Sequence, residues 1–306
     1  MASSSAPEHS TRRALDAVAL AHVQQRMQRA AQPPWLHGEV ARRMAQRLPV
    51  IRLQPQRIID WGAFLGASHG LLERTYPRAT VLAVEFDAAR CAATAMALQR
   101  PWWSVRRWRD GAANACLAAQ VEPGCTQLLW SNMGLHGAID PQAEMAAWHR
   151  ALEVDGFLMF STLGPGSLQG LSALYAAQHW PPPMAPLVDM HDLGDMLAQA
   201  GFADPVMDQE TITLTWPTAP ALLSELRLLG GNVEPRRGPG LRTPRWLARL
   251  ESLLADRAGA DGRIALDFEL VYGHAFRAAP RARMAALTEL PLDEMRAMVR
   301  GSGRRA

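Results

Sequence analysis

Apolar and polar stretches alternate in a regular rhythm through the middle of the chain. Short apolar runs of strand length are separated by longer stretches whose apolar residues recur with the period of an amphipathic helix. Strands alternating with helices at this spacing are typical of a doubly wound, mostly parallel α/β sheet with right-handed crossovers. The pattern predicts strands at 57–61, 80–85, 103–107, 126–132 and 155–162, and helices at 67–76, 87–99, 111–119 and 140–153.

The flanking segments extend this pattern and predict three parts of the chain. We expect an N-terminal tail and helix over 1–34, a main domain over 35–280, and a C-terminal tail over 281–306. Within the main domain, a helical and Arg-rich insertion over 218–256 precedes the last strand. The elements expected around it are a helix at 36–48, a helix at 189–200, a strand at 211–216 and a long last strand at 264–277.

Composition indicates an ordinary globular protein. The chain has 48% apolar and 20% charged residues, and no apolar run approaches the ~20 residues of a membrane span. It contains no lysine, and its net charge of +3 is too small to indicate binding of nucleic acid. The first residues lack the apolar core of a signal peptide. The three cysteines, Cys91, Cys116 and Cys125, lack metal-ligand spacing, so we expect a reduced cytoplasmic protein without a metal.

The most informative stretch is a glycine-bearing turn after the first strand. Residues 57–66 read RIIDWGAFLG, and the second strand ends in Glu85. A strand, a glycine turn, a helix and a second strand with a terminal carboxylate are typical of a site for an adenosine-type cofactor. Phe64 stands where such a loop usually needs a second glycine. Its ring must either pack outward or fill the pocket, and taken alone Glu85 and Asp110 also fit helix caps or ion pairs. We expect Glu85 to be exposed at the end of its strand, and His136 to be a satisfied polar or surface histidine.

Later segments of the chain resemble a known family. The alternating units and the closing strands resemble class I S-adenosylmethionine-dependent methyltransferases. Within that class, the chain is similar to the malonyl-acyl-carrier-protein O-methyltransferases of biotin synthesis, over roughly residues 36–277. The resemblance implies a seven-stranded sheet with an antiparallel last strand, and S-adenosylmethionine as cofactor. The segments that carry it are LLWSNMGLHGAID (128–140), FSTLGPGSL (160–168), HDLGDMLAQAGFADPVMD (191–208), LRLLGGN (226–232) and FELVYGHAFR (268–277).

The resemblance implies cofactor-binding roles for residues at four successive strand ends. After the first strand it matches the acid, the first glycine and the last glycine of the family's loop. After the next three strands it matches the ribose-binding acid, the residue that meets the adenine amino group, and a residue beside the methionine moiety. These residues are Asp60, Gly62, Gly66, Glu85, Asp110 and Asn132. The family also closes a Tyr-Asp pair over the cofactor, and here Trp35 is the nearest substitute.

Methyl transfer to a carboxylate needs alignment and exclusion of water rather than a covalent intermediate, so we expect no catalytic triad. The resemblance implies that the acceptor is a malonyl thioester delivered by acyl carrier protein or by coenzyme A, beneath the insertion at 218–256. A cation should meet its carboxylate, and Arg227 is our candidate. Two alternatives stay open: a methyltransferase for another small acid, and an inactive relative that uses the fold for binding.

Overall fold

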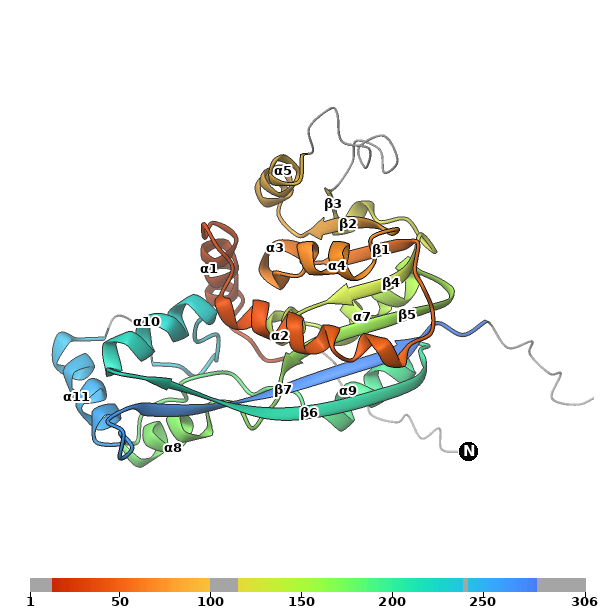
Figure 1. Cartoon of the computed structure of the whole chain (residues 1–306). Helices are drawn as coiled ribbons and strands as arrows, with labels where there is room; N and C mark the ends of the chain where they lie inside the picture. Colours follow the sequence, from red (N-terminus) through yellow and green to blue (C-terminus); the bar gives the residue numbers. More distant parts are fainter. Residues whose placement is uncertain (1–12, 100–114, 239–241, 280–306) are drawn as a thin grey trace, which may run out of the picture.

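The computed structural model describes residues 13–99, 115–238 and 242–279. These residues contain a seven-stranded sheet with the order β3-β2-β1-β4-β5-β7-β6 (Figure 1). The first five strands pair in parallel, and β7 is antiparallel to both of its neighbours. This confirms the predicted fold class. The strands are β1 (Arg57–Trp61), β2 (Thr80–Glu85), β3 (Ala115–Leu117), β4 (Thr126–Ser131), β5 (Leu152–Leu163), β6 (Ala203–Trp216) and β7 (Ile264–Phe276).

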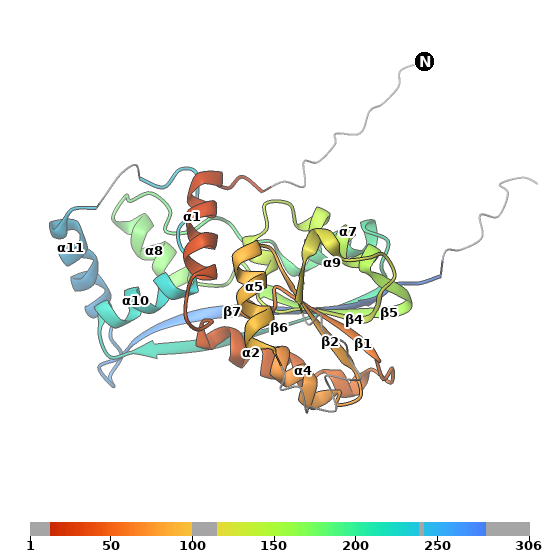
Figure 2. The same ribbon diagram turned by 90° about the horizontal axis from the view of Figure 1, so that it is seen from above.

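Helices cover both faces of the sheet. Helices α2 (Trp35–Ala45) and α4 (His69–Thr75) lie on one face, and α7 (Pro141–Ala151) and α9 (Met190–Gln199) lie on the other (Figure 2). Within the described residues, no helix is long and apolar enough to cross a membrane. The other helices are α1 (Ala17–Gln28), α3 (Ala63–Gly66), α5 (Ala88–Ala97), α8 (Gln169–Ala177), α10 (Ala219–Leu229) and α11 (Pro244–Ala255).

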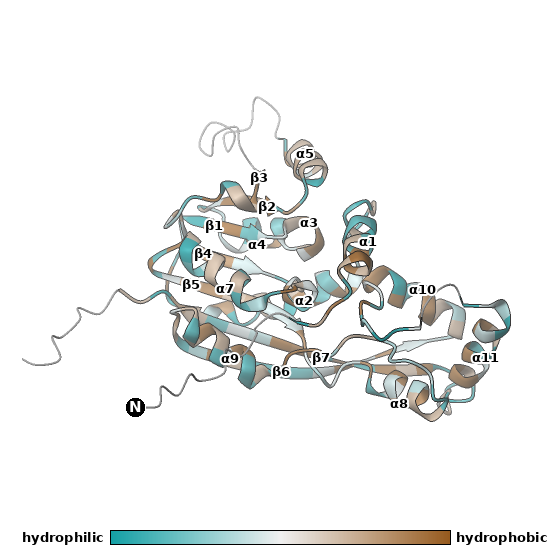
Figure 3. Ribbon diagram, turned by 180° about the vertical axis from the view of Figure 1, so that it is seen from behind, coloured by the Kyte–Doolittle hydropathy of each residue, from teal (hydrophilic) through white to brown (hydrophobic). Residues whose placement is uncertain are grey.

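Successive residues of the central strands point to opposite faces and build two hydrophobic cores. Ile58 and Leu128 pack in the core beneath α2 and α4, whereas Ile59 and Leu129 pack in the core beneath α7 and α9. Both cores are therefore built from the same short strands, whose residues are brown on the hydropathy scale of Figure 3.

The last two strands are much longer than the others and extend past the parallel part of the sheet to α8, α10 and α11 (Figure 1). Leu250 and Leu254 of α11 are buried in the same core as Ile58, so the insertion is packed onto the sheet extension rather than separate from it. Strand β6 begins at Ala203, earlier than the predicted 211, and α8 was not predicted.

Strand β3 lies in a segment that was predicted to be helical. It spans Ala115–Leu117, so the helix predicted at 111–119 is wrong for these residues. The strand predicted at 103–107 lies outside the described residues. Alanine-rich sequence favours a helix locally, but here Ala115 pairs with Ala83 at the edge of the sheet, and tertiary pairing overrides that propensity.

Gly273 of β7 tests how tightly β5, β6 and β7 are packed. A Cβ added there would lie 2.2 Å from Cε1 of Phe160, whose buried ring also packs against Trp148. We expect Gly273→Ala to lower the free energy of unfolding by about 1–3 kcal/mol, because the ring has no room to yield. Urea denaturation measures this. In the control Gly170→Ala, the added Cβ meets its nearest neighbour, Leu266, at 3.7 Å, and equal losses in the two variants would contradict the packing argument.

Candidate active site

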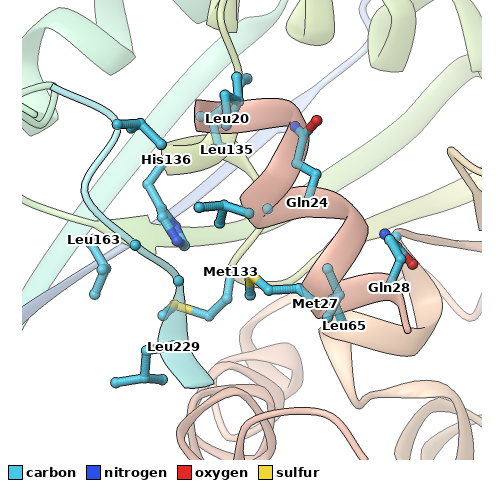
Figure 4. A pocket seen from close by; sticks show the side chains of 18 of the residues that line it. Leu20, Gln24, Met27, Gln28, Leu65, Met133, Leu135, His136, Leu163 and Leu229 are labelled. Carbon is cyan, nitrogen blue, oxygen red and sulfur yellow. The ribbon is translucent and has the colours of Figure 1, made fainter. Parts of the chain in front are cut away.

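A cavity of about 1070 Å³ lies at the carboxyl edge of the parallel strands. Its walls include Gly62, Phe86 and Asn132, which directly follow β1, β2 and β4, and Leu163, the last residue of β5. Helix α1 covers it with Leu20, Gln24, Met27 and Gln28, and Leu229 of α10 lines it as well (Figure 4). Sequence alone did not predict that α1 would form this wall.

The glycine turn keeps its backbone shape despite Phe64. Gly62 has a φ of +73°, a conformation that glycine adopts without strain, and its amide donates to the carbonyl oxygen of Val84 at 2.8 Å. The next residues form the single helical turn α3, which ends at Gly66. The turn therefore retains the sharp change of direction after β1 that opens the cavity.

The Phe64 ring packs outside the cavity. The guanidinium of Arg90 on α5 stacks over this ring at 3.7 Å, and the same guanidinium donates to the carbonyl oxygen of Ala30 at 3.2 Å. Phe64 is not among the residues that line the cavity. Of the two conformations considered from the sequence, the structure therefore has the outward one.

Glu85 is buried, and this corrects the expectation that it is an exposed acid at the end of a strand. Its Oε1 accepts hydrogen bonds from the backbone amide of Phe64 and from the hydroxyl of Thr94, both at 2.9 Å. Its Oε2 is buried and has no partner within the described residues. Burial, opposed by these two hydrogen bonds, raises the pKa of Glu85. The carboxylate thus anchors α3 through one oxygen and keeps a second, buried oxygen that no described residue engages.

Asp60 is fully buried and faces α4 rather than the cavity. Its Oδ1 accepts from the hydroxyl of Ser68 at 3.1 Å, and its Oδ2 lies 3.8 Å from Nδ1 of His69. Burial raises the pKa of Asp60 well above its ordinary value, and the negative charge of Glu85 adds to this rise. The geometry makes Asp60 a support of the turn.

The side chain of Asn132 is fully engaged within the protein. Its Nδ2 donates to the carbonyl oxygens of His37 at 2.7 Å and of Gly66 at 2.6 Å, and its Oδ1 accepts from the hydroxyl of Ser161 at 2.6 Å. Asn132 lines the cavity. Its amide therefore shapes the site by holding α2, the glycine turn and β5 together.

The structure separates the sequence-derived residues into two groups. Gly62, Asn132 and Arg227 line the cavity, whereas Asp60, Gly66 and Glu85 lie directly behind its wall. Asp110 falls outside the described residues. Trp35 does not line the cavity; its side chain is 52% exposed and its indole nitrogen donates to Glu225, so it does not close the site as suggested.

Three further cavity residues were missed by reasoning from the sequence. Phe86 directly follows Glu85, is 52% exposed, and places its ring against Gly62. Its position directly after the strand-end acid could have indicated this role. Nothing in the sequence indicates Arg13 or His136, because they meet only through a contact across 123 residues. In that contact, Arg13 donates to the carbonyl oxygen of His136.

Two neutral histidines lie close to Asn132. Burial lowers the pKa of His37 to about 4 and that of His136 to about 3, with the charge of Arg13 contributing at His136. His37 Nδ1 lies 2.7 Å from the carbonyl oxygen of Leu65, while Nδ1 of His136 is buried without a hydrogen-bond partner in the described part of the chain. The imidazole of His136 points into the cavity (Figure 4). The expectation that His136 is a satisfied or surface histidine is therefore wrong.

The residues fit an adenosine-type cofactor. Glu85 offers an unpartnered buried carboxylate oxygen that suits a ribose hydroxyl, the exposed Phe86 ring offers an apolar face, and Gly62 lets a ligand approach the backbone. The described residues contain no group of three or more potential metal ligands.

Comparison with known proteins gives close sequence relatives, although no family model matches the chain. The chain is 38% identical to the malonyl-[acyl-carrier protein] O-methyltransferase of Laribacter hongkongensis, over 81% of this chain and 84% of that protein. It is 35% identical to the protein of the same name from Gallionella capsiferriformans, over 80% and 85% of the two chains. A third such protein, from Halorhodospira halophila, is 37% identical over 79% and 81%.

Asp60 gives a pH-dependent prediction. Because its folded-state pKa is raised, its contribution to stability is full below the unfolded pKa and is lost as the pH rises through the folded-state pKa. Asparagine keeps the acceptor for Ser68 and cannot ionise. In urea denaturation, we expect the free energy of unfolding of Asp60→Asn to exceed that of the unmodified protein by an amount that grows from pH 6 to pH 9, by up to about 1.4 kcal/mol per pH unit.

The control is Asp87→Asn, because exposed Asp87 caps α5 through the amide of Arg90 at 2.9 Å and asparagine preserves that cap. Its difference from the unmodified protein should stay constant over the same range. If the difference for Asp60→Asn were also constant, ionisation of Asp60 would not lower the stability of the folded protein, and the prediction would be wrong.

Proposed function

The chain belongs to the malonyl-[acyl-carrier protein] O-methyltransferase family, and we propose that it transfers a methyl group from S-adenosylmethionine to the free carboxylate of a malonyl thioester. The observation that carries this proposal is 38% identity over more than four fifths of both chains. The biosynthetic context is biotin synthesis. Three free cysteines support action in the cytoplasm.

The reaction needs alignment more than acid–base chemistry. When bound, S-adenosylmethionine supplies a methyl group already activated by its sulfonium sulfur. A carboxylate oxygen of the acceptor forms the new C–O bond as the C–S bond breaks, and the bond's electron pair stays on sulfur. No proton moves, so the protein's task is to orient two ligands and exclude water.

We propose the following division of work among the residues. Glu85 binds the ribose hydroxyls through Oε2, Phe86 lies against the base, and Gly62 admits the ligand to the backbone. Asp60, Gly66 and Asn132 hold the turn and the loop after β4 in place. Asp110 remains our candidate for the adenine amino group, and α1 excludes water from above.

The insertion at 218–256 is proposed to cover the acceptor, because the end of α10 lines the cavity. We propose that its outer side receives the acyl carrier protein in preference to coenzyme A. Of its arginines, Arg236 pairs with Glu234 and Arg237 pairs with Asp16, so the charges of these two are already paired within the protein.

Arg227 lines the cavity, and the other three arginines of the insertion form what we call the α11 face, which consists of Arg242, Arg245 and Arg249. All three are exposed and none forms an ion pair with a described residue; Arg242 stacks over Trp246 at 4.6 Å. Figure 3 shows hydrophilic residues at the outer turns of α11. An unpaired cationic face suits an acidic partner.

Cofactor binding tests the proposed function directly. We expect the purified protein to bind S-adenosylhomocysteine with a micromolar Kd in titration calorimetry, and to convert a malonyl thioester into its methyl ester. Glu85→Gln keeps an acceptor for Phe64 and Thr94 but loses the free oxygen, so Kd should rise about tenfold, the value of a hydrogen bond to a charged group.

Phe64→Gly is the matched control for Glu85→Gln. Because the Phe64 ring lies under Arg90 and outside the cavity, its removal should change Kd less than about threefold. Binding that appears only after Phe64 is removed would show a blocked site. Absence of binding in all three proteins would favour the inactive relative over the enzyme.

The α11 face predicts a difference in salt dependence between substrates. Added salt shortens the Debye length from ~10 Å at 0.1 M, and this weakens steering toward an exposed charged face. We expect kcat/KM for malonyl-acyl carrier protein to fall at least about threefold more than kcat/KM for malonyl-pantetheine, which has no acidic protein attached, between 0.05 and 0.5 M salt. The double variant Arg245→Gln/Arg249→Gln should remove this excess, and Arg236→Gln should not. Equal salt dependence for the two substrates would eliminate the docking face.

A further inference from the structure

Arg13 is a partly buried cation without a carboxylate partner in the described part of the chain. Its guanidinium donates to two carbonyl oxygens, one from His136 and one from Pro186, the latter at 2.5 Å. No carboxylate among the described residues forms an ion pair with it, and burial lowers its pKa with no charged group opposing the shift. Removing a guanidinium from water without a counter-charge is costly, so an anion from outside the protein would be favoured here.

Arg13 lies on the acceptor side of the cavity. It lines the same cavity as Asn132, and its partner His136 comes four residues after Asn132, on the loop that follows β4. Pro186 belongs to the segment before α9, from which Ala185 and Leu187 also line the cavity. The residues suited to the cofactor, Gly62 and Phe86, follow β1 and β2 instead. Arg13 therefore faces the part of the cavity that the cofactor leaves for a second ligand.

The other cations of the cavity wall are less suited to the inner position. Arg90 stacks on Phe64 and holds the carbonyl oxygen of Ala30. Arg26 is exposed and donates to the carbonyl oxygens of Arg227 and Gly230. Arg227 is exposed at the end of α10, where water screens its charge. Arg29 is exposed as well.

Hydrogen-bond capacity also favours Arg13. A guanidinium has five N–H donors, and two carbonyl bonds leave three for a ligand. His136 adds an imidazole with a buried Nδ1 that lacks a partner among the described residues. A carboxylate has two oxygens, so one can be held by these groups while the other stays free to react.

We propose that Arg13, fixed by the carbonyl oxygens of His136 and Pro186, binds the carboxylate of the methyl acceptor, with the imidazole of His136 as a second hydrogen-bonding group. The inference rests on the proposed function and deepens it, because it names the group that selects an acid acceptor. Arg227, at the exposed rim, is then the first cation that the carboxylate meets rather than the one that holds it.

The test compares the acid with its neutral methyl ester in each protein variant. Dissociation constants for malonyl-pantetheine and for its methyl ester are measured in the presence of S-adenosylhomocysteine, which prevents turnover. For Arg13→Gln we expect acid affinity to fall about 10- to 100-fold, as for a charge-assisted bond, while ester affinity changes less than about threefold. Arg13→Lys should recover part of the preference, since it restores the charge without the planar fork.

Arg227→Gln is the matched control and should keep the preference for the acid. Because the acid-to-ester ratio is internal to each variant, a general loss of structure cancels from it. Equal weakening of acid and ester by Arg13→Gln would show a purely structural role for Arg13. Loss of the preference in Arg227→Gln in place of Arg13→Gln would transfer the role to Arg227. Failure of the proposed function is distinct, because the unmodified protein would then bind no S-adenosylhomocysteine and form no ester.

Discussion

The carboxyl edge of this sheet depends on one buried amide. Asn132 is only 2% exposed. Its Nδ2 donates to two carbonyl oxygens, and its Oδ1 accepts from the hydroxyl of Ser161. Ser161 in turn accepts from the backbone amide of Met133 at 3.1 Å. An aspartate at position 132 would direct a carboxylate at two carbonyl oxygens, and an aliphatic residue would leave three buried polar groups unpaired, each costing about 1–3 kcal/mol. The spacing between α2, the glycine turn, β4 and β5, and hence the cavity, follows from this network.

The glycine turn tolerates Phe64 because its backbone requires glycine at only two of its positions. The two glycines that remain stand where the backbone needs them, because Gly62 has a positive φ and Gly66 approaches Asn132 closely. The middle position faces outward, where Arg90 covers the Phe64 ring. Glu85 then caps the turn through the amide of Phe64. Loss of a motif residue thus changed the outer surface of the turn while its inner surface kept the geometry that a nucleotide requires.

The periodicity of apolar residues was sufficient to predict the helices and strands that bury apolar side chains. Strands β1, β2, β4 and β7 and helices α5, α7 and α9 lie within a few residues of their predictions, since each carries its own apolar pattern. Strand β3 was predicted as a helix because it lies in an alanine-rich segment, and only its pairing with β2 makes it a strand. At the site, the glycine turn indicated Gly62 and the family resemblance indicated Asn132, but neither could show that Glu85 is buried, because burial depends on tertiary packing. The role of Arg13 in the site could not be predicted, because its hydrogen-bond partners are distant in sequence.

The way in which α1 is fastened has a consequence for the chemistry of the cavity. Arginines hold the N-terminal segment largely through carbonyl oxygens: Arg13 binds those of His136 and Pro186, and Arg26 binds those of Arg227 and Gly230. A carbonyl oxygen fixes a guanidinium without neutralising it, whereas a carboxylate would do both. The carboxylates that line the cavity are Asp87 and Glu144, against five arginines: Arg13, Arg26, Arg29, Arg90 and Arg227. The contacts that hold α1 over the cavity therefore also leave the cavity positive, which favours the binding of an acid.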